Sequence, residues 1–178
     1  MRRWLLGVTL TVAALGAVLL SLFLYLADRF TASGPLVEPV TLIIPSGTGL
    51  RDITELLARS KVIDSTLVFV LGVRYEAATR GLQAGEYAFP AHVSGRGVMD
   101  ILRSGDTVVR RLAVPEGLTN LRIAQLLRET EGLQGNIPML PGEGMLLPET
   151  YHFSWGDTRE EMVARMHRAM REALREGW

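Results

Sequence analysis

The sequence predicts an α+β protein that begins with one membrane-spanning helix. Three observations lead to this prediction. A run of 24 residues near the N-terminus, Trp4 to Ala27, contains no charged side chain. Along the rest of the chain, short β-branched runs alternate with apolar residues at helical spacing. A pattern of strand, turn and helix also occurs twice, and its two copies lie 70 residues apart.

The uncharged run is long enough to cross a bilayer. At about 1.5 Å per residue it extends roughly 36 Å, which exceeds the hydrocarbon core of about 30 Å. Arg2 and Arg3 precede the run, whereas the charges of Asp28 and Arg29 after it cancel. This asymmetry favours a cytoplasmic N-terminus with the bulk of the chain on the far side. The alternative is a cleaved signal peptide, but its apolar region spans only about 7–15 residues. The run also ends in Leu-Phe-Leu-Tyr-Leu-Ala, which lacks a small-x-small cleavage site.

Composition restricts the partners of the remaining chain. With 178 residues in total, the part after the run is long enough for one domain of ordinary size or two small ones. Lys plus Arg and Asp plus Glu each number 19, so no net charge favours nucleic acid as a partner. The absence of cysteine excludes disulfides and thiolate sites, and it suits an exported chain.

A stalk and the first strand, turn and helix follow the run. The stretch from Thr31 to Pro39 is mostly small or polar and is interrupted by proline, which predicts a stalk over residues 30–39. The β-branched run Val40 to Ile44 predicts a strand, and the apolar spacing from Leu50 to Leu57 predicts a helix. The repeat pairs Pro45, Gly47, Ile53, Leu56 and Leu57 with Pro115, Gly117, Ile123, Leu126 and Leu127.

Caps and turn residues predict further short elements around the second copy. In chain order these are a helix from Ser65 to Arg80 stopped by Gly81, a strand from Gly85 to Phe89, a helix capped by Ser94 and ended by Gly105, and a strand from Thr107 to Leu112. Strands and short helices therefore alternate through this part of the chain.

The C-terminal part is predicted to be a long loop and then a helix. After Gly132, glycine, proline and asparagine recur, which is typical of a loop. Thr158 and Glu161 form a capping box at the beginning of a helix that reaches roughly Arg175. Its apolar stripe consists of Met162, Val163, Met166, Met170, Ala173 and Leu174. A stripe of this kind requires a partner surface.

Several common catalytic sets are absent from the sequence. His92, His152 and His167 stand far apart and form no metal-binding motif, so neither a metal nor any other cofactor is expected. No Gly-x-Ser-x-Gly motif is present, and Lys61 is the single lysine and follows no glycine-rich phosphate loop. Serine hydrolase and nucleotidase functions are therefore excluded.

One loop combines carboxylates with apolar and aromatic residues. It is the stretch from Gly142 to Phe153, which contains Glu143 and Glu149. Loss of water around a carboxyl group favours its protonated form, which is then able to donate a proton to a glycosidic oxygen. Alternatively, the two carboxylates cap or bridge backbone amides of the loop. Spacing does not decide between these interpretations, because Pro148 breaks any helical relation between Glu143 and Glu149.

At this loop the sequence resembles the endolytic murein transglycosylases, which are single-pass bacterial membrane proteins. The resemblance covers essentially the whole chain. Besides the N-terminal run, it rests on Ile44-Pro45-x-Gly47 within Thr41 to Leu57, Ala84-Gly85-Glu86-Tyr87, Val114-Pro115-Glu116-Gly117 and Glu143-Gly144-Met145-Leu146-Leu147-Pro148-Glu149-Thr150-Tyr151. Family members more often have Asp where this chain has Glu149.

The resemblance implies a particular domain organisation. It comprises a cytoplasmic stub and transmembrane anchor over 1–29, the stalk over 30–39, a lysin-motif-like module over 40–107, and a second strand, turn and helix with the start of a mixed α+β catalytic domain over 108–178. The implied location is the bacterial cytoplasmic membrane, with residues 4–27 in the bilayer. Implied partners are peptidoglycan glycan strands and cell-wall synthases.

The resemblance also implies a reaction, the endolytic cleavage of nascent peptidoglycan by lytic transglycosylation. In this lyase step a protonated Glu donates to the glycosidic oxygen, and the muramic acid's own primary hydroxyl closes an anhydro ring. No second carboxylate is needed as nucleophile or base, unlike in most glycoside hydrolases. The family's catalytic Glu lies in a later Ile-Glu-Lys-Glu-Thr-like helix, so it is expected beyond Trp178, and the chain is expected to be C-terminally truncated and inactive alone.

Within the chain, the resemblance assigns a substrate-binding role to Glu143, Glu149, Thr150 and Tyr151. The alternative function is a non-enzymatic, membrane-anchored module that binds peptidoglycan without cutting it. A variant of this alternative makes Glu143 itself the proton donor.

Overall fold

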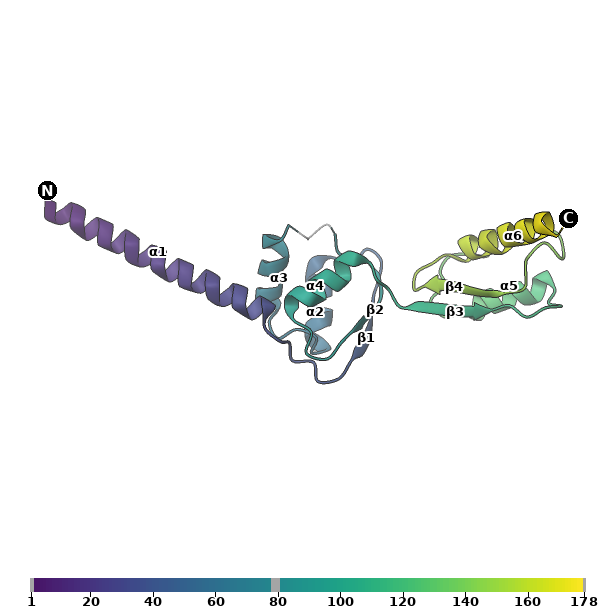
Figure 1. Ribbon diagram of the computed structural model, residues 1–178, viewed down its shortest axis with the longest axis horizontal. Coiled ribbons are helices and arrows are strands. Elements are labelled where there is room, and N and C mark those ends of the chain that lie inside the picture. Colours follow the sequence, from purple (N-terminus) through teal and green to yellow (C-terminus); the bar gives the residue numbers. More distant parts are fainter. Residues whose placement is uncertain (1, 78–80, 178) are drawn as a thin grey trace. The chain divides into compact units, whose positions relative to one another are not determined.

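The computed structural model describes residues 2–77 and 81–177 and has a mixed α+β architecture, which confirms the predicted fold class (Figure 1). In chain order its elements are α1 (Arg2–Thr31), β1 (Val40–Ile44), α2 (Leu50–Arg59), α3 (Thr66–Tyr75), β2 (Gly85–Phe89), α4 (Gly95–Ser104), β3 (Val109–Ala113), α5 (Asn120–Glu129), β4 (Thr150–Ser154) and α6 (Arg159–Glu176). The part of α1 from Val12 to Thr31 is long and apolar enough to be a candidate membrane span.

The chain forms two compact units. The first comprises Met1–Val40, Thr48–Leu82 and Phe89–Ser104, and the second comprises Thr41–Gly47, Gln83–Ala88 and Gly105–Trp178. Each unit takes segments from separate parts of the sequence. The assignment of residues 40–107 to one lysin-motif-like module therefore stays a prediction.

Helix α3 is central to the first unit, where it contacts α1, α2 and α4. Gly72 permits the close approach of α3 to α1, since a Cβ atom at this position would lie 2.5 Å from the ring of Phe30. The Phe30 and Phe69 rings pack with their centroids 6.3 Å apart. Ser65 caps α3 by accepting the N–H of Val68, as predicted. The helix ends at Tyr75 rather than near Arg80, and residues 78–80 lie outside the described part of the chain.

The segment that was predicted as a stalk packs along the first unit. Phe30 and Leu36 are buried. The N–H of Gly34 donates to the carbonyl of His92 at 3.2 Å, and the N–H of His92 donates to the carbonyl of Leu36 at 2.7 Å. A side chain at position 34 would collide with the backbone oxygen of Val93. The end of α1 is thus fixed to the unit by backbone hydrogen bonds as well as by apolar packing.

The internal repeat is present in the backbone. Helices α2 and α5 each have ten residues and begin exactly one repeat apart, at Leu50 and Asn120. The preceding turns contain Gly47 with φ 80° and Gly117 with φ 78°. This left-handed backbone conformation favours glycine, so the same turn geometry explains the glycine in both copies of the repeat.

The second unit contains the antiparallel pair β3 and β4, in which Leu112 lies opposite Tyr151 and Ala113 opposite Thr150. Strand β1 pairs with β2 in a separate two-stranded sheet. The core of the second unit combines side chains from β3, α5, β4 and α6, and its members are Leu112, Val114, Ile123, Leu127, Leu133, Leu146, Tyr151, Phe153, Met162, Val163 and Met166.

The last helix begins with the predicted capping box. The side chain of Thr158 accepts the N–H of Glu161, whose carboxylate accepts the N–H of Thr158 in return. The first part of the predicted apolar stripe, from Met162 to Met166, is buried in the core, whereas Leu174 is exposed. The stripe therefore obtains its partner surface from β3, β4 and α5 along the first turns of α6.

Candidate functional site

The candidate site lies in the second unit, where a loop leads from Pro141 into β4. Both carboxylate oxygens of Glu143 accept the N–H of Asn120, at 3.2 and 3.0 Å. The side-chain amide of Asn120 donates to the carbonyl of Pro141 at 2.6 Å. A carboxylate at this position satisfies a free N–H at the beginning of α5 and interacts favourably with the helix dipole. Glu143 therefore ties the loop to α5 as a hydrogen-bond acceptor, in agreement with the capping alternative.

Tyr151 fixes the other end of the loop. Its ring belongs to the buried core, and its hydroxyl donates to the carbonyl of Leu147 at 2.8 Å. Burial, with a further contribution from the negative charge of Glu149, raises the pKa of Tyr151 from 10.0 to about 12. Its ring is consequently a positioning element of the loop and does not offer a face for stacking on a sugar.

The raised pKa of Tyr151 predicts that the protein loses stability at alkaline pH. The folded state holds the phenol proton to higher pH than the unfolded state, so the stabilisation is present below pH 10 and is lost as pH rises toward about 12. We expect the free energy of unfolding to fall by about 2 kcal/mol across this interval. Tyr151→Phe should remove most of this slope, as measured by hydrogen exchange or denaturant titration at several pH values.

A smaller slope should remain in Tyr151→Phe, because burial also raises the pKa of Tyr87. An unchanged alkaline slope in Tyr151→Phe would show that other groups cause the loss of stability.

The register of β3 and β4 separates an inner from an outer face. Tyr151 and Phe153 point into the core, so their neighbours point outward because successive residues of a strand alternate. The outer face carries exposed Thr150 and His152 on β4 and exposed Arg111 opposite His152 on β3. We call Arg111, Thr150 and His152 the outer polar face. Its hydroxyl, imidazole and guanidinium groups can all form hydrogen bonds with a polar ligand.

Glu149 directly precedes the outer polar face. The backbone of Glu149 is held in place because its carbonyl accepts the N–H of Val114 at 2.9 Å. This hydrogen bond extends the β3–β4 pairing by one step. The side chain is exposed, and within residues 2–77 and 81–177 it has no hydrogen bond or ion pair. Of the four predicted site residues, Glu149 and Thr150 thus present free polar groups to solvent, whereas Glu143 and Tyr151 shape the loop.

An ion pair between buried Glu86 and partly exposed Arg110 lies on the inner side of the same unit. Arg110 donates from Nε to Glu86 Oε2 at 2.6 Å and from Nη2 to Glu86 Oε1 at 3.0 Å, which is a bidentate arrangement. These hydrogen bonds raise the pKa of Arg110. The guanidinium carbon lies 4.8 Å from the ring centroid of Trp155, and Glu131 is a further charged neighbour at 3.8 Å. This cluster joins β2, β3 and the end of β4.

Sequence reasoning named Thr150 of the outer polar face but missed Arg111 and His152, and it missed the ion pair. The alternation Thr-Tyr-His-Phe-Ser from Thr150 to Ser154 is a signal that could have indicated a strand with one polar face. Nothing in the local sequence indicated that Glu86 and Arg110 would meet. Within residues 2–77 and 81–177, no group of three or more His, Cys, Asp or Glu side chains is arranged to hold a metal ion.

Comparison with known proteins identifies related sequences over most of the chain. A family model described as the YceG-like family matches residues 42–178. No curated protein matches the chain. A crystal structure from Listeria monocytogenes that is described as a yceG-like protein is similar, with 24% sequence identity and a TM-score of 0.46 over 79% of this chain. The chain spans 56% of the length of that protein chain.

Proposed function

The chain belongs to the YceG-like family, and from this membership we propose that it acts in the endolytic cleavage of nascent peptidoglycan glycan strands. The observation that supports the proposal is the family match over residues 42–178, which includes the whole loop from Glu143 to Tyr151. The YceG family is that of the endolytic murein transglycosylases. Peptidoglycan is accordingly the proposed substrate.

The proposed reaction is a lytic transglycosylation. An acid donates a proton to the glycosidic oxygen, the bond from this oxygen to the anomeric carbon of muramic acid breaks, and the primary hydroxyl oxygen of the same sugar bonds to that carbon as it loses its proton. The products are a free sugar hydroxyl and an anhydro-muramic end. No residue of this chain is assigned as the acid, because Glu143 acts as an acceptor at α5 and Glu86 is paired with Arg110.

We assign glycan binding to the outer polar face and Glu149. Sugar hydroxyls need both donors and acceptors, and Glu149 and Thr150 supply an exposed carboxylate and hydroxyl side by side. Arg111 adds a planar cation that suits carboxylates of the substrate. Glu143 and Tyr151 act indirectly by fixing the loop that carries Glu149. A second glycan contact over residues 40–107 is part of the same proposal.

The proposed location is the bacterial cytoplasmic membrane, with the N-terminus inside and the folded units outside. Arg2 and Arg3 before the span support this orientation. The first unit, to which α1 belongs, then lies beside the membrane surface at which new glycan strands appear. Cell-wall synthases are proposed partners on the same grounds.

Binding to purified sacculi tests the proposal. The full chain in nanodiscs should sediment with sacculi, and Arg111→Ala should weaken this binding by about tenfold, because a hydrogen bond to a charged group contributes about 1.5–3 kcal/mol. Arg171→Ala is the matched control, since Arg171 is an exposed arginine of α6 outside the face. Equal binding by both variants would contradict the assignment of glycan binding to the outer polar face.

Product analysis tests whether a residue of this chain acts as the acid, so that the chain cuts peptidoglycan by itself. The 178-residue chain is expected to bind sacculi and release no anhydro-muramic ends, because none of its residues is assigned as the acid. Mass spectrometry of the soluble products measures this directly. Release of anhydro-muramic fragments that Glu143→Gln abolishes would instead identify Glu143 as the proton donor.

A further inference from the structure

Helix α3 carries an uncovered apolar face in the first unit. Leu67, Leu71 and Tyr75 are 64%, 40% and 74% exposed. They are spaced four residues apart, so they form one stripe along the helix. Phe69 and Val73 on the other side are buried. The helix is therefore apolar on both sides, although the stripe side is largely exposed and contacts α1 through Tyr75 and Phe23.

This helix lies against the end of the candidate membrane span. Phe69 of α3 packs against Phe30, whereas Tyr75 packs against Phe23 with the ring centroids 5.5 Å apart. Phe23 precedes Phe30 by seven residues, which is about 10 Å along a helix. The ring contacts of α3 thus reach over about 10 Å along the span. Interfacial helices bury their apolar face to a depth of about 5–10 Å, which agrees with this reach.

A groove of about 460 Å³ lies between the two helices. Its apolar walls are formed by Phe23, Leu26, Ala27 and Phe30 of α1 and by Leu71 and Tyr75 of α3. Glu76 and Arg96 also line it and supply its polar part. Four of the wall residues belong to the candidate span, so the groove opens to lipid where α1 enters a bilayer.

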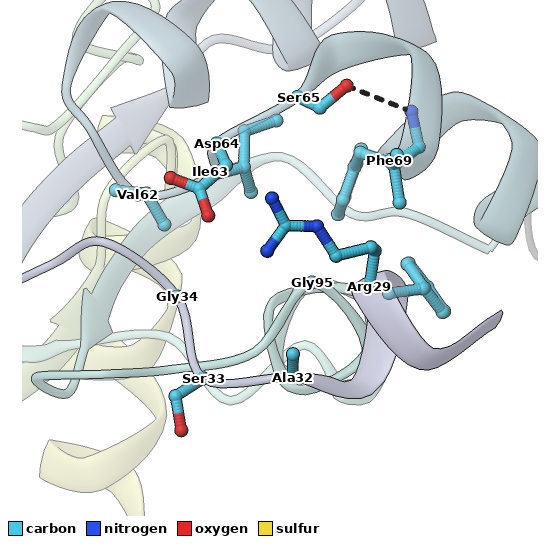
Figure 2. Close-up of a pocket in the computed structure, with 12 residues that line it drawn as sticks. Arg29, Ala32, Ser33, Gly34, Val62, Ile63, Asp64, Ser65, Phe69 and Gly95 are labelled. Atoms are coloured by element: carbon cyan, nitrogen blue, oxygen red, sulfur yellow. Dashed lines mark hydrogen bonds between the residues drawn. The ribbon is translucent and has the colours of Figure 1, made fainter. Parts of the chain in front are cut away.

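Two arginines lie close to the groove, and their side chains differ in direction and exposure. Figure 2 shows the guanidinium of Arg29 directed into a separate cavity of about 60 Å³, toward the segment from Ile63 to Ser65. The side chain of Arg96 is instead 53% exposed, and among residues 2–77 and 81–177 its ion pair is a long contact of 3.7 Å with Glu76. Arg96 is thus the cation available to a ligand in the groove. Arg74, beside the exposed stripe, has a stem long enough to carry its charge to the headgroup level.

We propose that α3 inserts its Leu67–Leu71–Tyr75 stripe into the adjacent leaflet and that the groove between α1 and α3 binds one phospholipid. An acyl chain fills the apolar part of the groove, and the headgroup phosphate pairs with Arg96. The span and α3 then hold the first unit at a fixed depth, which a single helix with a loose linker would not do. This inference is independent of the proposed function.

Site-specific labelling tests the insertion of α3. The chain has no cysteine, so Leu71→Cys and Arg59→Cys provide single labelling sites on α3 and on the exposed end of α2. In full chain reconstituted into vesicles, a fluorophore at position 71 should be quenched by brominated acyl chains and shielded from an aqueous quencher. The same fluorophore at position 59 should show the opposite behaviour.

A label in the middle of α1, at Leu19→Cys, reports insertion of the span itself. Quenching by brominated lipid at position 19 but not at position 71 would overturn the proposal and leave the span intact. Loss of lipid quenching at both positions would overturn the insertion of α3 and also the membrane span in α1. Energy transfer between labels at position 71 of different copies, with no lipid quenching, would assign the stripe to self-association and also contradict the proposal.

Native mass spectrometry tests the lipid in the groove. Full chain released from nanodiscs of phosphatidylglycerol and phosphatidylcholine should retain one phospholipid. Arg96→Ala should lower this retention about fivefold, because one arginine near an anionic lipid surface contributes about 1 kcal/mol. Ala27→Trp should block the groove and abolish retention, whereas Arg59→Ala is the control. Equal retention by all variants would show that the bound lipid lies elsewhere and would overturn the groove assignment.

Discussion

Replacement of Phe153 by alanine is expected to destabilise the second unit by about 3–5 kcal/mol, the range for truncation of a buried aromatic ring. Phe153 is buried in the core that β3, α5, β4 and α6 share, so its loss leaves a cavity with walls from four elements. A loss of this size is a large fraction of the about 5–15 kcal/mol that stabilises a typical domain. Hydrogen exchange of the amides of α5 and β4 measures the change.

Two substitutions serve as controls for Phe153→Ala. Phe153→Leu keeps most of the side-chain volume and should cost about 1.5 kcal/mol or less. His152→Ala changes the adjacent residue on the outer face, where the side chain is exposed, and should alter stability by only about 0.5 kcal/mol. Similar losses for His152→Ala and Phe153→Ala would contradict the β3–β4 register, because the register places the two side chains on opposite faces.

Removal of the Glu86 carboxylate should have the second largest effect. Glu86→Ala leaves Arg110 without its bidentate partner in a mostly buried environment. Breaking a buried pair in this way costs about 3–5 kcal/mol, and the partial exposure of Arg110 favours the lower value, about 3 kcal/mol. Denaturant titration of the full chain in detergent, followed by near-ultraviolet circular dichroism, would report the loss.

The double variant Glu86→Leu/Arg110→Met distinguishes an unpaired charge from lost packing. Removal of both charges leaves no buried ion without a partner, so the double variant should recover most of the stability lost in Glu86→Ala. A double variant that is as unstable as Glu86→Ala would show that the pair acts through its shape and not through its charges.

Local features of the fold could be predicted from the sequence, because neighbouring residues determine them. The strand from Val40 to Ile44 and the strand from Gly85 to Phe89 are confirmed with the predicted bounds. The caps at Ser65 and Ser94 are confirmed by their hydrogen bonds to backbone N–H groups. The capping box at Thr158 is confirmed by its reciprocal hydrogen bonds.

Features that depend on distant residues were not predicted. The pairing of β3 with β4 joins segments separated by residues 114–149, which include α5, and no local pattern specifies such a register. The same reason applies to the ion pair of Glu86 and Arg110. At the candidate site, the sequence left the role of Glu143 open between proton donor and cap. Its hydrogen bonds to Asn120 support the cap, because the partner is a backbone amide of a helix 23 residues earlier.

The most direct test of the glycan-binding assignment is to map the contact on the chain. Isotope-labelled chain in nanodiscs would be titrated with a purified glycan fragment of alternating N-acetylglucosamine and N-acetylmuramic acid, and the amide resonances would be recorded. Our account predicts saturable shifts at Arg111, Thr150 and His152, with Arg171 unchanged. Saturable shifts confined to residues outside β3 and β4, or no shifts at any glycan concentration, would contradict it.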